Sequence, residues 1–184
     1  MGPLSLEGSE LLRHRRTLAP GRVLSKCGLR LLLALAGILP AGIADGASNK
    51  VRVSDLSDIA FGPIGNLGTD AIRSESLCLY ANTDTNGYNI TATGIGPGGS
   101  FVLTSGVQPL PFEVAWSSSA GQNSGTPVAP NIPLAGQVST AANQSCNSGP
   151  ATTASLVVIL RAAALSNATA GTYTGTLTLV VGPE

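Results

Sequence analysis

Residues 173–181 read Tyr-Thr-Gly-Thr-Leu-Thr-Leu-Val-Val. Threonines and large apolar residues alternate through this stretch, and an alternation of period two places them on opposite faces of a β-strand. Residues 112–116, Phe-Glu-Val-Ala-Trp, show the same period. Both stretches are predicted to be strands that bury one face and expose the other.

Shorter alternating stretches predict further strands around residues 51–53, 88–92 and 101–103. Continuous apolar runs at 77–80 and 156–160 suit strands that are buried on both faces. Gly, Pro and Asn clusters separate these stretches at short intervals, and about seven strands spaced in this way are typical of an antiparallel β-sandwich. Residues 161–165 are the one expected helix. The sequence therefore predicts an all-β protein with a single antiparallel sandwich domain.

Residues 117–133 are rich in Ser, Gly, Asn and Pro and contain few residues to bury. We expect a long surface loop within the domain, because the stretches on both sides are needed for one core. Trp116 ends its strand beside this loop. It is therefore a candidate surface contact, although most aromatic residues of the chain are in phase with strand cores.

An apolar run of nine residues, 31–39, follows six of the ten basic residues of the chain. Basic flanks, a short apolar run and then small residues are typical of a secretory signal, whereas a transmembrane helix needs about 20 apolar residues. Cleavage after Ala44 and cleavage after Gly46 both satisfy the small-residue rule. We expect residues 1–46 to be a leader with a secretory signal peptide and residues 47–184 to be the exported domain, without a transmembrane segment.

The charge and the histidine content of the expected mature chain exclude several classes of function. From residue 45 onward, the chain left by cleavage after Ala44, there are 4 basic and 8 acidic residues, so 4 − 8 gives a net charge of −4, which disfavours a nucleic-acid partner. The single histidine, His14, lies in the leader, so histidine-dependent catalytic arrangements are excluded. The acidic pairs Asp55/Asp58 and Asp84/Glu113 are interpreted as solubilising charges. We expect no enzyme activity, no cofactor and no metal site.

Two cysteines remain in the expected mature chain, Cys78 and Cys146. In an exported protein, an even pair without a neighbouring histidine indicates a disulfide rather than a zinc site, which needs four ligands. We therefore expect Cys78 and Cys146 to be joined.

Several segments together resemble the spore coat protein U domain family, whose members are subunits of archaic chaperone-usher pili and related secreted proteins. The segments are Leu-Ser-Asp-Ile-Ala-Phe-Gly at 56–62, Leu-Cys-Leu-Tyr at 77–80, Gly-Tyr at 87–88, the stretch 111–116, Cys146, and Ala-Gly-Thr-Tyr-Thr-Gly-Thr-Leu-Thr-Leu at 170–179. The similarity spans nearly all of the expected mature chain.

The resemblance implies an incomplete immunoglobulin-like sandwich that lacks its last strand. A periplasmic chaperone, an outer-membrane usher and neighbouring pilus subunits would be its partners, and a donor strand would add to an open sheet edge. The candidate edge is the final strand, with Tyr173, Leu177, Leu179 and Val181 on it. The expected role is a structural or adhesive pilus subunit at the cell surface, acting in attachment and biofilm formation.

The N-terminal part departs from the family pattern, since only about five residues separate the cleavage zone from Val51 and polymerising pilins carry a donor strand of roughly ten there. If Val51 and Val53 belong to the domain, the chain accepts a strand without giving one, as a tip or minor subunit does. Alternatively, residues 50–59 are themselves the donor. A different function also stays open: a self-sufficient secreted sandwich that binds a carbohydrate or protein ligand.

Overall fold

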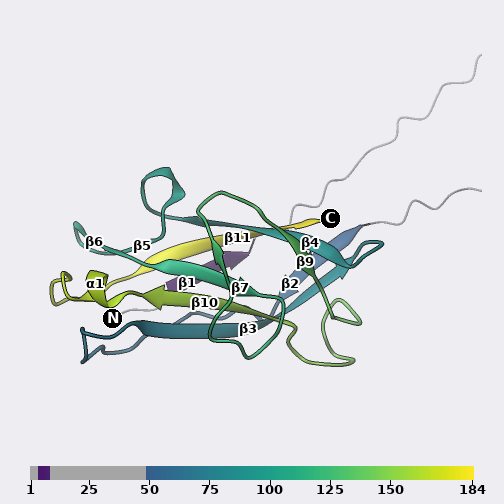
Figure 1. The fold of residues 1–184 in the computed structure, drawn as a ribbon, viewed down its shortest axis with the longest axis horizontal. Helices are drawn as coiled ribbons and strands as arrows, with labels where there is room; N and C mark the ends of the chain where they lie inside the picture. Colours follow the sequence, from purple (N-terminus) through teal and green to yellow (C-terminus); the bar gives the residue numbers. More distant parts are fainter. Residues whose placement is uncertain (1–3, 9–48) are drawn as a thin grey trace, which may run out of the picture. The chain divides into compact units, whose positions relative to one another are not determined.

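The computed structural model describes residues 4–8 and 49–184 (Figure 1). The predicted apolar signal run and the cleavage sites after Ala44 and Gly46 lie outside the described residues. Within the described part of the chain, no helix is both long and apolar enough to cross a membrane.

The strands form two larger sheets and one hairpin (Figure 1). One sheet has the order β1-β11-β4-β9, with bounds Leu4–Gly8, Gly175–Pro183, Gly87–Gly94 and Leu134–Val138. The other has the order β2-β3-β10-β7-β8, with bounds Lys50–Ser54, Ala71–Asn82, Ala154–Leu160, Glu113–Ser117 and Thr126–Val128. The hairpin joins β5 (Val102–Ser105) to β6 (Gln108–Pro111), and the short helices are η1 (Pro97–Gly99) and α1 (Ala162–Leu165). The antiparallel all-β prediction is confirmed, and the expected helix is present.

The two larger sheets contribute to one apolar core. Alternate residues of each strand point inward, so that Leu177 and Leu179 of β11 belong to the same buried cluster as Leu156 and Val158 of β10. Tyr88 of β4 and Trp116 of β7 meet edge to face across the core, with ring centroids 6.3 Å apart.

The continuous apolar run of β10 is buried on both faces, as its sequence predicts. Leu156 and Val158 face the core, whereas Val157 is equally buried but lies on the opposite face with Ser155. Residues 118–125 cover this outer face, because Ser155 Oγ accepts a hydrogen bond from Gln122 N and donates one to Ser119 O.

The interpretation of residues 117–133 as a plain surface loop is wrong in part. Residues 126–128 form β8, and Val128 is buried. The chain then crosses to the other sheet, where Pro130 forms an isolated β-bridge with Ala92. Three strands that the sequence analysis missed contain residues that normally mark turns: β6 and β8 contain prolines, and β9 contains Gly136.

Candidate functional site

The outer edge of β11 is the candidate functional site. Leu177 and Leu179 are buried, Val181 is half-buried, and the threonines between them point the other way. Tyr173 precedes the strand. Its ring is buried in the core, and its hydroxyl donates to the carbonyl oxygen of Thr169 at 3.1 Å. One edge of β11 pairs with β4 from Leu177↔Gly94 to Pro183↔Tyr88, which leaves the opposite edge for another strand.

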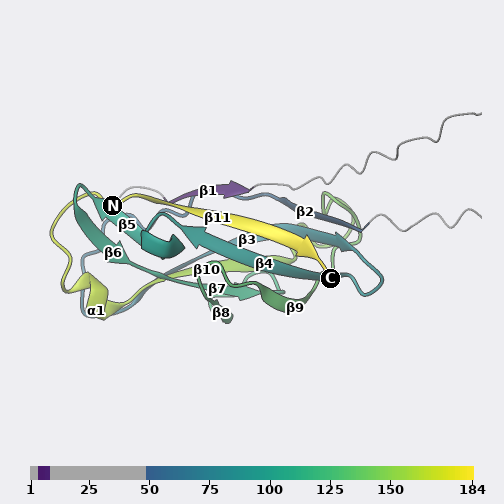
Figure 2. The same ribbon diagram turned by 90° about the horizontal axis from the view of Figure 1, so that it is seen from above.

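That opposite edge is occupied by β1, which comes from the beginning of the chain. The pairing is parallel and runs from Leu4↔Gly175 through Leu6↔Leu177 to Gly8↔Leu179. All other strand pairs among the described residues are antiparallel. Figure 2 shows β1 (purple) along the outer side of β11 (yellow), with β2 near the same edge. Sequence analysis missed β1 because its short pattern, Leu-Ser-Leu-Glu-Gly, lies ahead of the predicted signal run.

The edge strands β8, β2 and β9 carry features that discourage a further strand. Pro127 of β8 has no N–H to offer to a neighbour. The edge strand β2 exposes Lys50 and Arg52, and β9 is short and irregular in register. In β9 the N–H of Gly136 already donates to the Glu184 carboxylate at 2.8 Å. Among the described strands, β11 is therefore the one whose outer edge takes a complete partner strand from a distant part of the sequence.

The first strand of the domain, β2, is fully used within the fold. It pairs antiparallel with β3 from Lys50↔Asn82 to Ser54↔Cys78, and Val51 and Val53 pack against the core. Residues 78–82 of β3 pair with β2 along one edge of β3, and residues 71–77 pair with β10 along its opposite edge. Residues 50–54 thus act as a strand of the domain itself.

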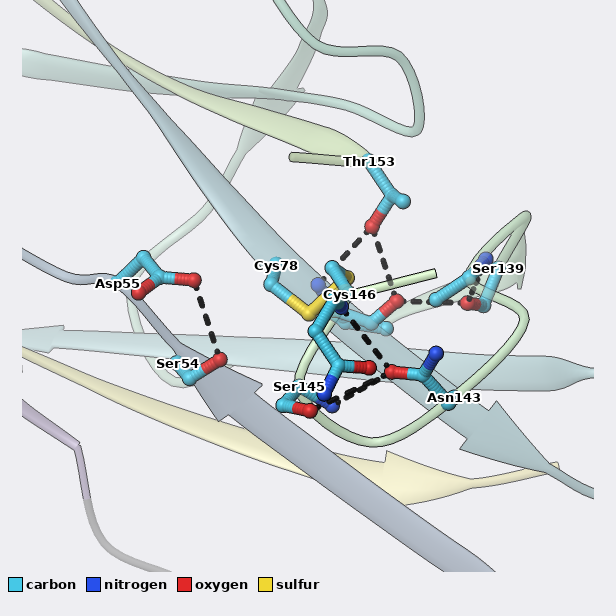
Figure 3. Close-up of a disulfide and its surroundings, with 11 residues drawn as sticks. Ser54, Asp55, Cys78, Ser139, Asn143, Ser145, Cys146 and Thr153 are labelled. Carbon is cyan, nitrogen blue, oxygen red and sulfur yellow. Dashed lines mark hydrogen bonds between the residues drawn. A yellow bond between two sulfur atoms is a disulfide. The ribbon is translucent and has the colours of Figure 1, made fainter. Parts of the chain in front are cut away.

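Cys78 and Cys146 are joined by a disulfide between β3 and the loop that follows β9 (Figure 3). Both residues are buried. The backbone N–H groups of Ser145 and Asn147 donate to Oδ1 of Asn143, which folds the loop around Cys146. The disulfide fixes this loop to β3 beside the point where β2 joins the sheet.

Two hydroxyl groups extend the hydrogen bonding of β3 beyond the end of β10. Thr153 Oγ1 accepts from Leu79 N and donates to Leu79 O, both at 3.0 Å, and Ser139 Oγ donates to the same carbonyl at 2.6 Å. Figure 3 shows both side chains directed toward β3 near the disulfide. No motif marks these residues, since only the folded chain brings Ser139 and Thr153 to one strand edge.

The interpretation of Trp116 as a surface contact is not supported, because its side chain is 1% exposed. The indole Nε1 donates to Tyr88 Oη at 3.0 Å. The Tyr88 hydroxyl lies 3.1 Å from Ser118 Oγ, which donates to Gln137 Oε1 at 2.8 Å. Burial raises the pKa of Tyr88. Trp116 therefore links the two sheets from within the core.

The acidic residues are dispersed, apart from one ion-pair network. Arg161, directly after β10, contacts Asp70 at 2.8 Å and Glu113 at 2.5 Å. The pKa of Asp70 is lowered by the Ala162 backbone N–H and then by Arg161, and the pKa of Glu113 is lowered by Arg161. Within the part of the chain that the structure describes, no group of three or more metal-binding side chains gathers.

No family model matches this chain, and no curated protein matches it. Several solved structures are similar to this chain, and two of them come from fimbriae. One belongs to a chaperone–tip adhesin complex of CFA/I fimbriae biogenesis, with 18% identity, coverage of 74% of this chain and 41% of that chain, and a TM-score of 0.47. The other is a mutant of the CFA/I adhesin CfaE of enterotoxigenic E. coli, with 13% identity, coverage of 75% and 49%, and a TM-score of 0.40. The chain spans less than half the length of either.

Proposed function

We propose that the chain is an exported subunit of a chaperone-usher surface pilus of the spore coat protein U type, and that the outer edge of β11 accepts a strand from a partner. The observation that carries this proposal is the pairing of β11 with β1, a separate strand from the beginning of the chain. Residues 1–46 are removed on export in this proposal, so residues 47–184 must obtain the missing strand elsewhere.

The hydrogen-bonding groups left unpaired by the loss of β1 explain why a partner strand is needed. Without β1, the backbone groups along residues 175–179 lose their ladder partners, and unpaired edge groups favour pairing with another chain. Val51 and Val53 of β2 and Val181 of β11 are apolar side chains that are only partly buried. A donor strand would restore the ladder and cover this apolar surface, which is the physical basis of β-augmentation.

The proposed partners follow the assembly order of such pili. A periplasmic chaperone would supply the first strand, and a neighbouring subunit would replace it at the outer-membrane usher. Because residues 50–54 are paired with β3, they are not available as a donor strand, which supports a tip or minor subunit. The proposed role is attachment at the cell surface and biofilm formation, without enzymatic activity.

A strand-binding experiment tests the acceptor edge. A fluorescent peptide with the sequence of residues 1–10 is added to refolding residues 47–184, and its retention is followed by size exclusion. We expect a stable complex, and we expect no complex with a control peptide carrying Ser5→Pro and Leu6→Pro, which removes two consecutive backbone N–H donors. Equal retention of both peptides, or of neither, would argue against an acceptor edge at β11.

A further inference from the structure

The strand register places side chains of β3, β10 and β7 side by side in rows across the outer face of the five-stranded sheet. The first row is Ser76, Ser155 and Ser117, on β3, β10 and β7. All three hydroxyls bind the loop of residues 118–125: Ser76 Oγ accepts from Gly121 N, Ser155 Oγ accepts from Gln122 N, and Ser117 Oγ accepts from Ser119 N. The loop is therefore fastened over this row.

The opposite end of the face is left uncovered. There the row is Ile72, Ile159 and Glu113, on the same three strands. Ile72, near the start of β3, is 40% exposed, and Ile159 beside it is partly exposed. The loop stops short of this row at Asn123, whose side chain Oδ1 accepts from Ser74 Oγ at 2.7 Å.

A cleft of about 460 Å³ lies between the loop and Arg161. Its walls include Asn123 and Ser124 of the loop. Its apolar lining includes Ile72 and Ile159 of the sheet face and, beside β7 and β8, Phe112, Pro127 and Pro130. Sites for small molecules are concave and mostly apolar, with a few polar groups and volumes of roughly 300–1,000 Å³. The hydrogen bonds that hold the loop form this cleft in advance of any ligand.

The polar end of the cleft pairs a carboxylate with a guanidinium. Arg161 holds one carboxylate oxygen of Glu113, and within residues 49–184 no group donates to the other oxygen. The pKa of Glu113 is lowered, so the carboxylate stays ionised and acts as an acceptor only. Arg161 has five N–H donors, and it uses two of them in the contacts with Glu113 and Asp70.

We propose that this cleft binds a neutral pyranose sugar. A sugar hydroxyl can both donate and accept a hydrogen bond. One hydroxyl would donate to the Glu113 carboxylate, and a neighbouring hydroxyl would accept from the Arg161 guanidinium. The C–H face of the ring would lie on the apolar floor of Ile72 and Ile159. An anionic ligand is disfavoured because Asp70, Glu113 and Arg161 together carry a net negative charge. The proposal is independent of strand acceptance at β11.

Saturation-transfer NMR on the purified full chain tests the proposal with methyl glycosides of glucose, galactose and mannose, against methyl glucuronide and a lysine-containing peptide. We expect at least one neutral glycoside to bind through its ring C–H protons. Glu113→Gln should weaken its affinity by about tenfold or more, the usual effect of losing a hydrogen bond to a charged group.

Asp70→Asn is the matched control, because it also removes one carboxylate partner of Arg161 but lies outside the cleft lining. We expect it to change the affinity by less than about twofold, as for an exposed ion pair. The proposal is overturned if no neutral glycoside binds, if Glu113→Gln binds as well as the unchanged protein, or if the peptide or the glucuronide binds in preference.

Discussion

Cys78 and Cys146 are the residues whose role follows most directly from the sequence. Their sequence separation is 68, and closing a loop of this length stabilises the folded state by about 4 kcal/mol in the chain-entropy account. Cys78→Ser or Cys146→Ser should therefore lower the melting temperature sharply in an oxidising medium. Thermal unfolding followed by circular dichroism measures this effect.

Ser145→Ala serves as the control for that loss, because Ser145 is exposed and lies next to Cys146. It should leave the melting temperature nearly unchanged. A cysteine variant that melts with the unchanged protein would refute a stabilising role of the bridge.

The burial of Trp116 could not be predicted from its neighbours in the sequence. The end of a strand beside a polar loop is compatible with exposure, and the alternation of 112–116 is compatible with burial. The decisive neighbour is Tyr88, which lies on the other sheet and accepts a hydrogen bond from the indole. Contacts between sheets depend on how the layers pack, and that information is distributed over the whole chain.

The final strand is the element whose period the sequence predicts best, since Leu177 and Leu179 lie on its buried face. Leu177→Asp should prevent folding, because it would place an unpaired carboxylate in the core. Thr178→Asp, one residue along on the opposite face, should still fold. Yield of soluble protein and circular dichroism distinguish the two; a normally folded Leu177→Asp would contradict the assigned face.

The junction of β10 with α1 gives a pH-dependent prediction. Asp70 and Glu113 have a lowered pKa in the folded chain, so their contribution to stability is complete above their ordinary values of 3.8 and 4.5. It is lost as the pH falls through the lowered folded values. Between about pH 5 and pH 2, urea midpoints should therefore fall more steeply for the unchanged protein than for Arg161→Met. Parallel profiles would show that the ion pairs do not stabilise the fold.

Strand prediction succeeded where the alternation within one segment indicates a strand. It failed where the segment forms a strand only because of the strand it pairs with. β8 and β6 contain prolines that are acceptable only because each strand lies at an edge or in a hairpin. β1 offers five residues of weak pattern and becomes a strand by pairing with β11. The cleft was equally hidden, since Ile72, Ile159 and Glu113 meet only through the register of three strands.

At the scale of the whole molecule, the outer edge of β11 differs from the other edges of the two larger sheets. The sheet edges at β2, β8 and β9 are protected by charge, proline or irregular pairing, whereas the outer edge of β11 is covered by a strand that export would remove in our proposal. A sandwich left without that strand has unpaired backbone groups along residues 175–179. Such a molecule should fold stably only together with a partner that supplies a strand.

The most direct test is to export residues 47–184 alone and with a periplasmic pilus chaperone, and to compare size-exclusion mass with unfolding followed by circular dichroism. We predict that the chain alone aggregates, and that it becomes soluble and unfolds cooperatively when the chaperone is present. A soluble monomer with a cooperative transition in the absence of any partner would contradict the account, because it would show that the sandwich is complete by itself.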